Sequence, residues 1–98
     1  MTEAAAHTLT ETTVPRFARG ARLQYDRVRE VWFIQAPERA FHADPVAAEI
    51  LQLVDATRTL GAVIDLLAQK FDAPRPVIAQ DVLAMVAELA EKQLLLLA

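Results

Sequence analysis

The chain has 98 residues and a formal net charge of −3, and 54 % of its residues are hydrophobic, although 19 of these are alanines. This composition is enough for one small domain with one modest core. The sequence contains no cysteine, serine or asparagine, which excludes a thiol or serine nucleophile, a cysteine-based metal site and a disulfide framework. We therefore expect a binding module rather than an enzyme, with no catalytic residue, no metal site and no cofactor.

Charge is unevenly distributed along the chain. Residues 14–39 hold six arginines against three acidic residues, whereas residues 45–98 hold four basic residues against seven acidic ones. The first part is therefore expected to attract an acidic partner and the second part to repel one.

The first residues differ in composition from the rest. Residues 1–13 are polar, rich in threonine and without an apolar period, so we expect a disordered leader there and a single domain over 14–98. No segment has the apolar core of a signal peptide or the length of a membrane span. We therefore expect a cytoplasmic protein with no membrane partner.

Three short strands are predicted in the first half of the chain. Arg22–Asp26 alternates polar and apolar residues, and Val31–Ala36 is rich in β-branched and aromatic ones. The connection 27–30 lacks glycine and asparagine, which favours a four-residue type I connection. A third strand over Arg39–Ala43 is expected after Pro37-Glu38, because proline cannot donate to a strand ladder.

Three helices are predicted after the strands. Asp44 is expected to cap the first, with Pro45 at its first position, and Thr59 to cap the second; the third is expected from about residue 77 to about residue 92. Apolar residues at helical spacing predict a buried stripe on each helix: Val46, Ile50, Leu53 and Val54 on the first; Val63, Ile64, Leu67 and Phe71 on the second; Ile78, Val82, Met85, Val86 and Leu89 on the third. Strands followed by helices predict an α+β fold, a winged-helix-like, three-stranded antiparallel sheet followed by a three-helix bundle.

The two histidines are the first candidates for chemistry. His42 lies close to Asp44 in sequence and is a conceivable general base, but no nucleophile accompanies it, so a half-exposed strand residue is the favoured interpretation. His7 lies in the leader. Two histidines so far apart, with scattered carboxylates, do not have the spacing of a metal site.

The alternative function is that of a winged-helix DNA-binding protein. The second and third helices, joined by a short connection, fit a helix-turn-helix in outline. The third helix, however, carries Asp81, Glu88 and Glu91, whereas phosphate contact needs clustered lysine or arginine. The favoured interpretation therefore includes no nucleic acid, and DNA binding stays as the alternative.

Several stretches of the chain closely resemble one family. Residues 22–29 (RLQYDRVR), 36–40 (APERA), 50–55 (ILQLVD) and 81–89 are similar to the PqqD family of pyrroloquinoline quinone (PQQ) biosynthesis, and the resemblance covers about residues 14–95. Ala56 and Gln93 stand where the family usually has glycine. Both positions are at helix ends, so the departures concern local cap geometry more than function.

The resemblance implies a winged-helix-like peptide-binding domain, a peptide chaperone or recognition element for ribosomally made precursor peptides. Members of the family bind the precursor peptide PqqA and present it to the radical S-adenosylmethionine (SAM) enzyme PqqE, which cross-links a glutamate and a tyrosine of the precursor. The family itself has no catalytic activity and no cofactor.

The mechanism that we expect is strand addition. An extended segment of the precursor would pair with the open edge of the third strand, and its apolar side chains would enter a groove beside the third helix. Arginines on the strand side would steer acidic residues of the peptide. The predicted peptide-binding residues are Arg39, Ala40, Phe41, His42 and Ala43 on the strand, and Val82, Met85, Val86 and Leu89 on the helix.

The open edge also predicts self-association. In a concentrated sample without peptide, we expect a second copy to cover the edge, giving a homodimer by exchange of the strand region. The leucine run at 94–97 is expected to pack on the domain, with a surface for a partner as the alternative.

Overall fold

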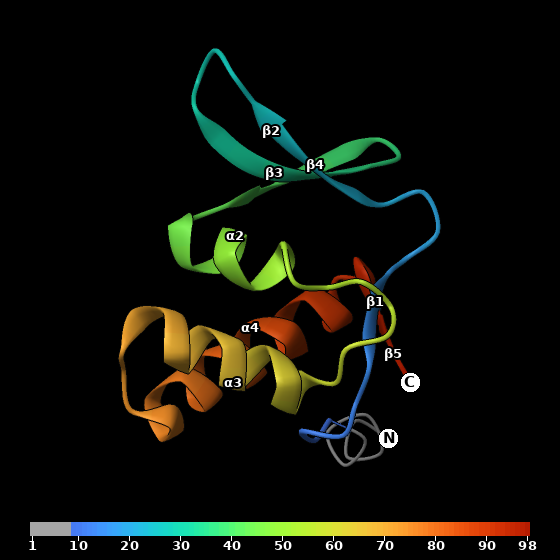
Figure 1. Cartoon of the computed structure of the whole chain (residues 1–98). Coiled ribbons are helices and arrows are strands. Elements are labelled where there is room, and N and C mark those ends of the chain that lie inside the picture. Colours follow the sequence, from blue (N-terminus) through green and yellow to red (C-terminus); the bar gives the residue numbers. More distant parts are fainter. Residues whose placement is uncertain (1–8) are drawn as a thin grey trace.

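The computed structural model describes residues 9–98 as an α+β fold in which an antiparallel sheet precedes three helices, as predicted (Figure 1). The elements in chain order are β1 (Pro15–Phe17), β2 (Arg22–Asp26), β3 (Val31–Ala36), β4 (Arg39–Ala43), α2 (Pro45–Leu51), α3 (Leu60–Phe71), α4 (Arg75–Glu91) and β5 (Leu95–Leu97).

The main sheet is antiparallel with the order β2-β3-β4, so β2 and β4 are its two edges. The predicted four-residue connection joins β2 to β3, and the Asp26 carboxylate accepts hydrogen bonds from the backbone N–H groups of Val28 and Arg29. A two-residue turn joins β3 to β4. Pro37 cannot take the positive φ that tight hairpin turns use, and Glu38 takes it instead, with φ of 63°.

A second, two-stranded sheet was not predicted from the sequence. β1 pairs with β5 in antiparallel register, from Pro15 opposite Leu97 to Phe17 opposite Leu95. Figure 1 shows the two strands side by side, so the start and the end of the domain are tied together. Leu94 and Leu95 are buried and Leu97 is partly buried, which confirms the predicted packing for these three leucines, whereas Leu96 is 42 % exposed.

The first two helices begin at the predicted caps. The Asp44 carboxylate accepts from the N–H of Ala47 at 2.8 Å, and the Thr59 hydroxyl accepts from the N–H of Ala62 at 3.1 Å. The stripe assigned to the first helix was wrong in part. α2 ends at Leu51, before Leu53 and Val54, and Val46 is 59 % exposed, because the inward face of the helix carries Ala47, Ala48, Ile50 and Leu51 instead.

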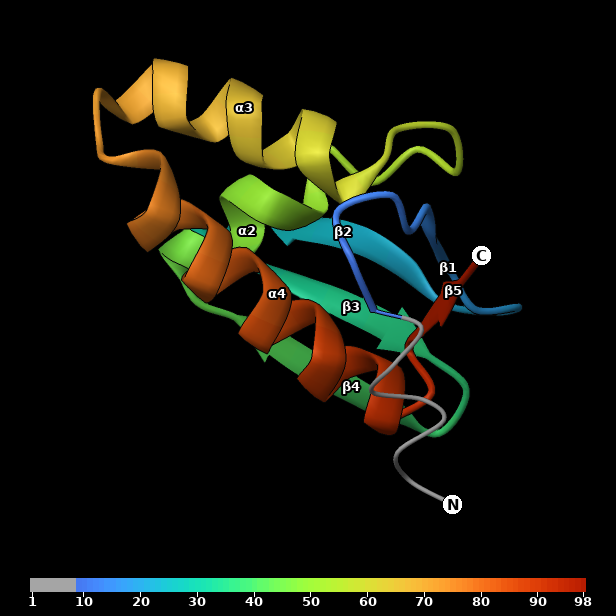
Figure 2. The ribbon, with the colours of Figure 1, turned by 90° about the horizontal axis from the view of Figure 1, so that it is seen from below.

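The helices form two layers against one face of the main sheet. Figures 1 and 2 show α2 between the sheet and the pair α3 and α4. α2 packs against β3 and β4, and α3 packs against α4. The core lies where these elements meet; its largest fully buried side chains include Ile34, Ile50, Leu51, Leu60, Ile64 and Leu89.

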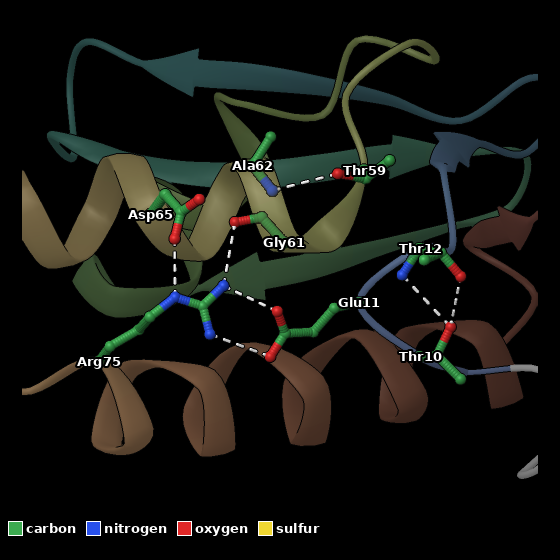
Figure 3. A network of polar contacts seen from close by, with 8 residues as sticks. All are labelled: Thr10, Glu11, Thr12, Thr59, Gly61, Ala62, Asp65 and Arg75. Atoms are coloured by element: carbon green, nitrogen blue, oxygen red, sulfur yellow. Dashed lines mark hydrogen bonds and ion pairs between the residues drawn. The ribbon is translucent and has the colours of Figure 1, made fainter.

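The end of the predicted leader makes defined contacts with the helices, through Glu11 and Thr13 (Figure 3). The Arg75 guanidinium donates to both carboxylate oxygens of Glu11, at 2.7 and 3.0 Å, and to Asp65 at 2.7 Å. The N–H of Gly61 donates to the carbonyl of Glu11. A Cβ at Gly61 would lie 3.2 Å from that oxygen, so glycine permits the close approach. Residues 1–8 of the predicted leader lie outside the described residues.

The backbone geometry at the end of α4 explains why the family usually has glycine at residue 93, one of the two positions at which this chain departs from the family. The N–H of Leu94 donates to the carbonyl of Leu89, and the N–H of Gln93 donates to that of Ala90. This is a Schellman motif, which places residue 93 in the left-handed region that glycine occupies most easily. Gln93 has φ of 61°, and Ala56, the other departure, has φ of 69°.

We predict that Gln93→Gly raises the free energy of unfolding by about 1 kcal/mol, because glycine relieves the left-handed strain at this position. Urea denaturation followed by circular dichroism measures the change. As the matched control, Ala90→Gly, inside α4, lowers the free energy of unfolding by about 1 kcal/mol. A loss of stability in Gln93→Gly would contradict the conclusion that the backbone of residue 93 is strained.

We predict that the Glu11–Arg75 contact stabilises the domain in a pH-dependent way. Hydrogen bonding to Arg75 lowers the pKa of Glu11 below its ordinary value of 4.5. The contribution of Glu11 is therefore fully present above pH 4.5 and is lost as the pH falls through the lowered pKa. Glu11→Gln should lower the urea midpoint at pH 7, and the difference from the parent should shrink towards pH 3. Glu91→Gln, an exposed change of the same kind, should show no such trend.

Candidate peptide-binding site

β4 is an edge strand of the main sheet. Within residues 9–98 it pairs with β3 alone, so the backbone groups on its other side have no strand partner among these residues. The two-residue turn closes on the pair Ala36–Arg39. The alternation of an antiparallel ladder then directs the backbone of Arg39, Phe41 and Ala43 towards β3. It directs the N–H and C=O groups of Ala40 and His42 to the open side.

Side chains along β4 alternate between the two faces of the sheet. Phe41 is half-buried and Ala43 is buried, both on the helix-facing side, whereas Ala40 and His42 are exposed on the opposite face. The predicted strand residues are therefore together on one element, and Ala40 and His42 are the two whose backbone is available to an added strand.

α4 lies in the layer beyond α2 and crosses β3 and β4 in the view of Figure 2. At its end, the Arg39 guanidinium donates to the carbonyl of Lys92 at 2.6 Å, and the Lys92 ammonium lies 6.0 Å from the ring centroid of Phe41. These contacts hold the start of the edge strand against the end of the helix. Arg39 is therefore a residue that positions the edge.

The predicted residues of α4 differ in burial. Val82, Val86 and Leu89 are at most 1 % exposed and belong to the core. Met85 is half-buried and lies at the margin of that core. The spacing 82, 86 and 89 marks the face that is turned inwards, and Met85 is the predicted helix residue with accessible surface.

A cavity that the sequence did not predict opens between α2, α3 and α4. Its volume is about 290 Å³, and its lining is apolar apart from two carboxylates. It is lined by Pro45, Val46, Glu49, Ile50, Leu67, Phe71, Ile78, Asp81 and Val82. The cavity begins just beyond the end of β4, because Pro45, which lines it, is separated from the strand by one residue. Val46 and Phe71 were predicted to be core, but they are about half exposed beside this cavity.

The structure offers little for the other readings. Asp44 lies two residues after His42 in sequence, and its carboxylate accepts a hydrogen bond from the N–H of Ala47. Within residues 9–98 no three or more metal-ligating side chains gather, and no helix is long and apolar enough to cross a membrane. Asp81, Glu88 and Glu91 are exposed on α4, so DNA binding gains no support from the charge of that helix.

Comparison with known proteins shows the family of the chain. The family model described as "Coenzyme PQQ synthesis protein D (PqqD)" matches residues 32–95, which span β3 to β5. The chain belongs to the PqqD family. It is therefore a protein of coenzyme PQQ synthesis, as the resemblance predicted.

Relatives and solved structures of the family cover most of the chain. A "PqqA binding protein" of Gluconobacter oxydans is 56 % identical over 97 % of this chain and 98 % of its own length. The "Bifunctional coenzyme PQQ synthesis protein C/D" of Methylorubrum extorquens is 43 % identical over 84 % of this chain, which corresponds to 22 % of that larger protein.

Two solved structures share the fold. The solution structure of the PqqD part of Methylobacterium extorquens PqqCD, described as a stand-alone recognition element for ribosomally synthesised peptides, has a TM-score of 0.75 at 42 % identity, covering 85 % of this chain and 88 % of that one. The crystal structure of PqqD from Xanthomonas campestris has a TM-score of 0.57 at 39 % identity, covering 76 % and 83 %.

Proposed function

We propose that this chain binds the precursor peptide PqqA and presents it to the radical SAM enzyme PqqE. The open β4 edge is the observation that carries the proposal, since it provides unpaired backbone groups beside an accessible apolar surface. The name of the Gluconobacter oxydans relative, "PqqA binding protein", supports it. The chain presents the substrate, and the radical enzyme supplies the chemistry.

The peptide binds as an added strand. Its backbone exchanges hydrogen bonds with Ala40 and His42, the two residues of β4 whose backbone points outwards. Backbone pairing provides affinity without reading the sequence, so the choice of precursor comes from side chains on either side of the new strand.

Selectivity comes from the apolar surface on the helix-facing side. Phe41 and Met85 are half-buried there and pack against the core. Val82, Val86 and Leu89 belong to that core. The cavity beyond Pro45 takes a large apolar side chain of the peptide. Its volume of about 290 Å³ is at the lower end of ordinary ligand pockets, which suits one or two side chains.

The charges at the two ends of this surface are opposite. Arg39 and Lys92 lie at the start of β4, whereas Glu49 and Asp81 line the cavity beyond its end. A bound peptide therefore places acidic residues near Lys92 and basic residues near the cavity, which sets its direction along the edge.

The first test removes a backbone donor from the edge. Ala40→Pro deletes the outward N–H at a position where proline does not break the β3 ladder. We predict that PqqA binding, measured by calorimetry, weakens by about 1 kcal/mol, roughly fivefold, or more. The matched control is Tyr25→Pro, which removes an outward N–H from the β2 edge and should leave PqqA affinity unchanged. Equal affinity for PqqA in the folded Ala40→Pro variant would rule out pairing at β4.

The second test concerns the apolar surface of α4. Met85→Glu places a charge where apolar side chains of the peptide pack, and we predict a loss of about 2 kcal/mol in PqqA affinity, roughly thirtyfold. Ala84→Glu adds the same charge at an exposed position one residue away. That control should bind within twofold of the parent, and a similar loss in both variants would contradict a specific role for Met85.

A further inference from the structure

The main sheet has a second open edge, on the side away from β4. Within residues 9–98, β3 is the one strand paired with β2. Since Ile34 and its alternate neighbours bond to β4, the intervening residues of β3 bond to Arg22, Gln24 and Asp26. The backbone N–H and C=O groups of Leu23 and Tyr25 therefore point away from the sheet.

Exposed arginines lie on both sides of this strand along the chain. One lies on β1, one in the loop before β2, one at the start of β2 and two in the turn after it; they are Arg16, Arg19, Arg22, Arg27 and Arg29. The carboxylate of Asp26 is already engaged by the turn backbone. In the part of the chain that the structure describes, Arg29 alone of the five has a carboxylate within 4 Å, at 3.9 Å from Asp26.

An apolar shelf lies on the helix-facing side of the same edge. Leu23 is half-buried, and Tyr25 is 46 % exposed with its ring 5.1 Å from that of Trp32. α2 packs against β3 and β4 and leaves Tyr25 accessible. The β2 edge thus combines outward backbone groups, an aromatic shelf on one face and cations on the other face and at both ends.

We propose that the β2 edge is a docking site for an extended segment of a partner protein in which acidic and apolar residues alternate. Paired with Leu23 and Tyr25, such a segment places its apolar side chains on the shelf and its carboxylates beside Arg22, with Arg19 and Arg27 at its ends. β3 separates this edge from β4, so the partner and the precursor peptide bind at the same time.

Charged residues near an edge strand also have a different role in many proteins, where they prevent edge-to-edge association. The two roles make opposite predictions. Arginines that recognise a partner are needed for acidic peptides to bind, whereas arginines that protect the edge are needed to keep the chain monomeric.

The experiment uses the full chain labelled with ¹⁵N and a synthetic seven-residue peptide in which glutamate alternates with valine. We expect the amide signals of Leu23 and Tyr25 to shift and their hydrogen exchange to slow, while those of Ala40 and His42 stay unchanged. Binding should weaken at high salt, because exposed ion pairs are screened. An analogue with lysine in place of glutamate should not bind.

Three variants locate the site. Tyr25→Pro, which removes an outward N–H, and Arg22→Gln/Arg27→Gln, which removes two cations, should each weaken probe binding about tenfold. Lys70→Gln/Lys92→Gln loses the same charge away from this edge and should bind within twofold of the parent. Ala40→Pro should bind the probe normally, which separates this proposal from the one for PqqA at β4.

The following outcomes would overturn the proposal: no binding of the glutamate–valine probe, shifts at Ala40 and His42 in place of Leu23 and Tyr25, or binding that salt does not weaken. A further outcome that would overturn the proposal is measured by light scattering. If Arg22→Gln/Arg27→Gln self-associates and still binds the probe as tightly as the parent, the arginines protect the edge and do not recognise a partner. None of these results contradicts the proposal that PqqA binds at β4, because PqqA binding is measured in separate experiments.

Discussion

The burial of one face of α4 is the interaction on which the rest of the structure depends. Val82, Val86 and Leu89 are almost completely inaccessible, and they join side chains from the sheet and from the other two helices in a single core. This packing fixes the position of α4 in the core, and the hydrogen bond from Arg39 to the carbonyl of Lys92 ties the start of β4 to the helix end. A small domain has few other buried side chains to replace these contacts. The β4 edge is therefore presented by a rigid element, which lowers the entropy lost when a peptide is bound.

The main sheet has three strands, and this leaves two open edges with different surroundings in the part of the chain that the structure describes. At β4 the exposed backbone is flanked by a half-buried apolar surface and leads to a cavity lined by Glu49 and Asp81. At β2 it is flanked by arginines and by the Tyr25–Trp32 pair. An edge of either kind accepts an extended chain, and the surrounding charges decide which chain. Arg22, Arg27 and Arg29, from the basic part of the sequence, thus lie at the β2 edge, whereas Glu49 and Asp81, from the acidic part, line the cavity beyond β4.

Much of the fold follows from local signals. The alternation in Arg22–Asp26, the caps at Asp44 and Thr59 and the proline after β3 each act within a few residues, and the structure has each element where these signals predict it. Similarity to the PqqD family also concerns runs of consecutive residues. The pairing of β1 with β5 and the contact of Glu11 with Arg75 join residues far apart in the chain, and nothing local to either segment indicates them.

The sequence by itself determined the three strands of the main sheet, the three helices and their order, the lack of a thiol or serine nucleophile and the family, but not the strands β1 and β5. Only the tertiary structure decided which apolar residues are core and which are accessible. Val46 and Phe71 have the same helical spacing as buried residues, yet they lie half exposed beside a cavity, while Val82, predicted to bind peptide, is buried. The physical reason is that periodicity identifies the apolar face of a helix, whereas exposure depends on how far neighbouring elements extend over that face.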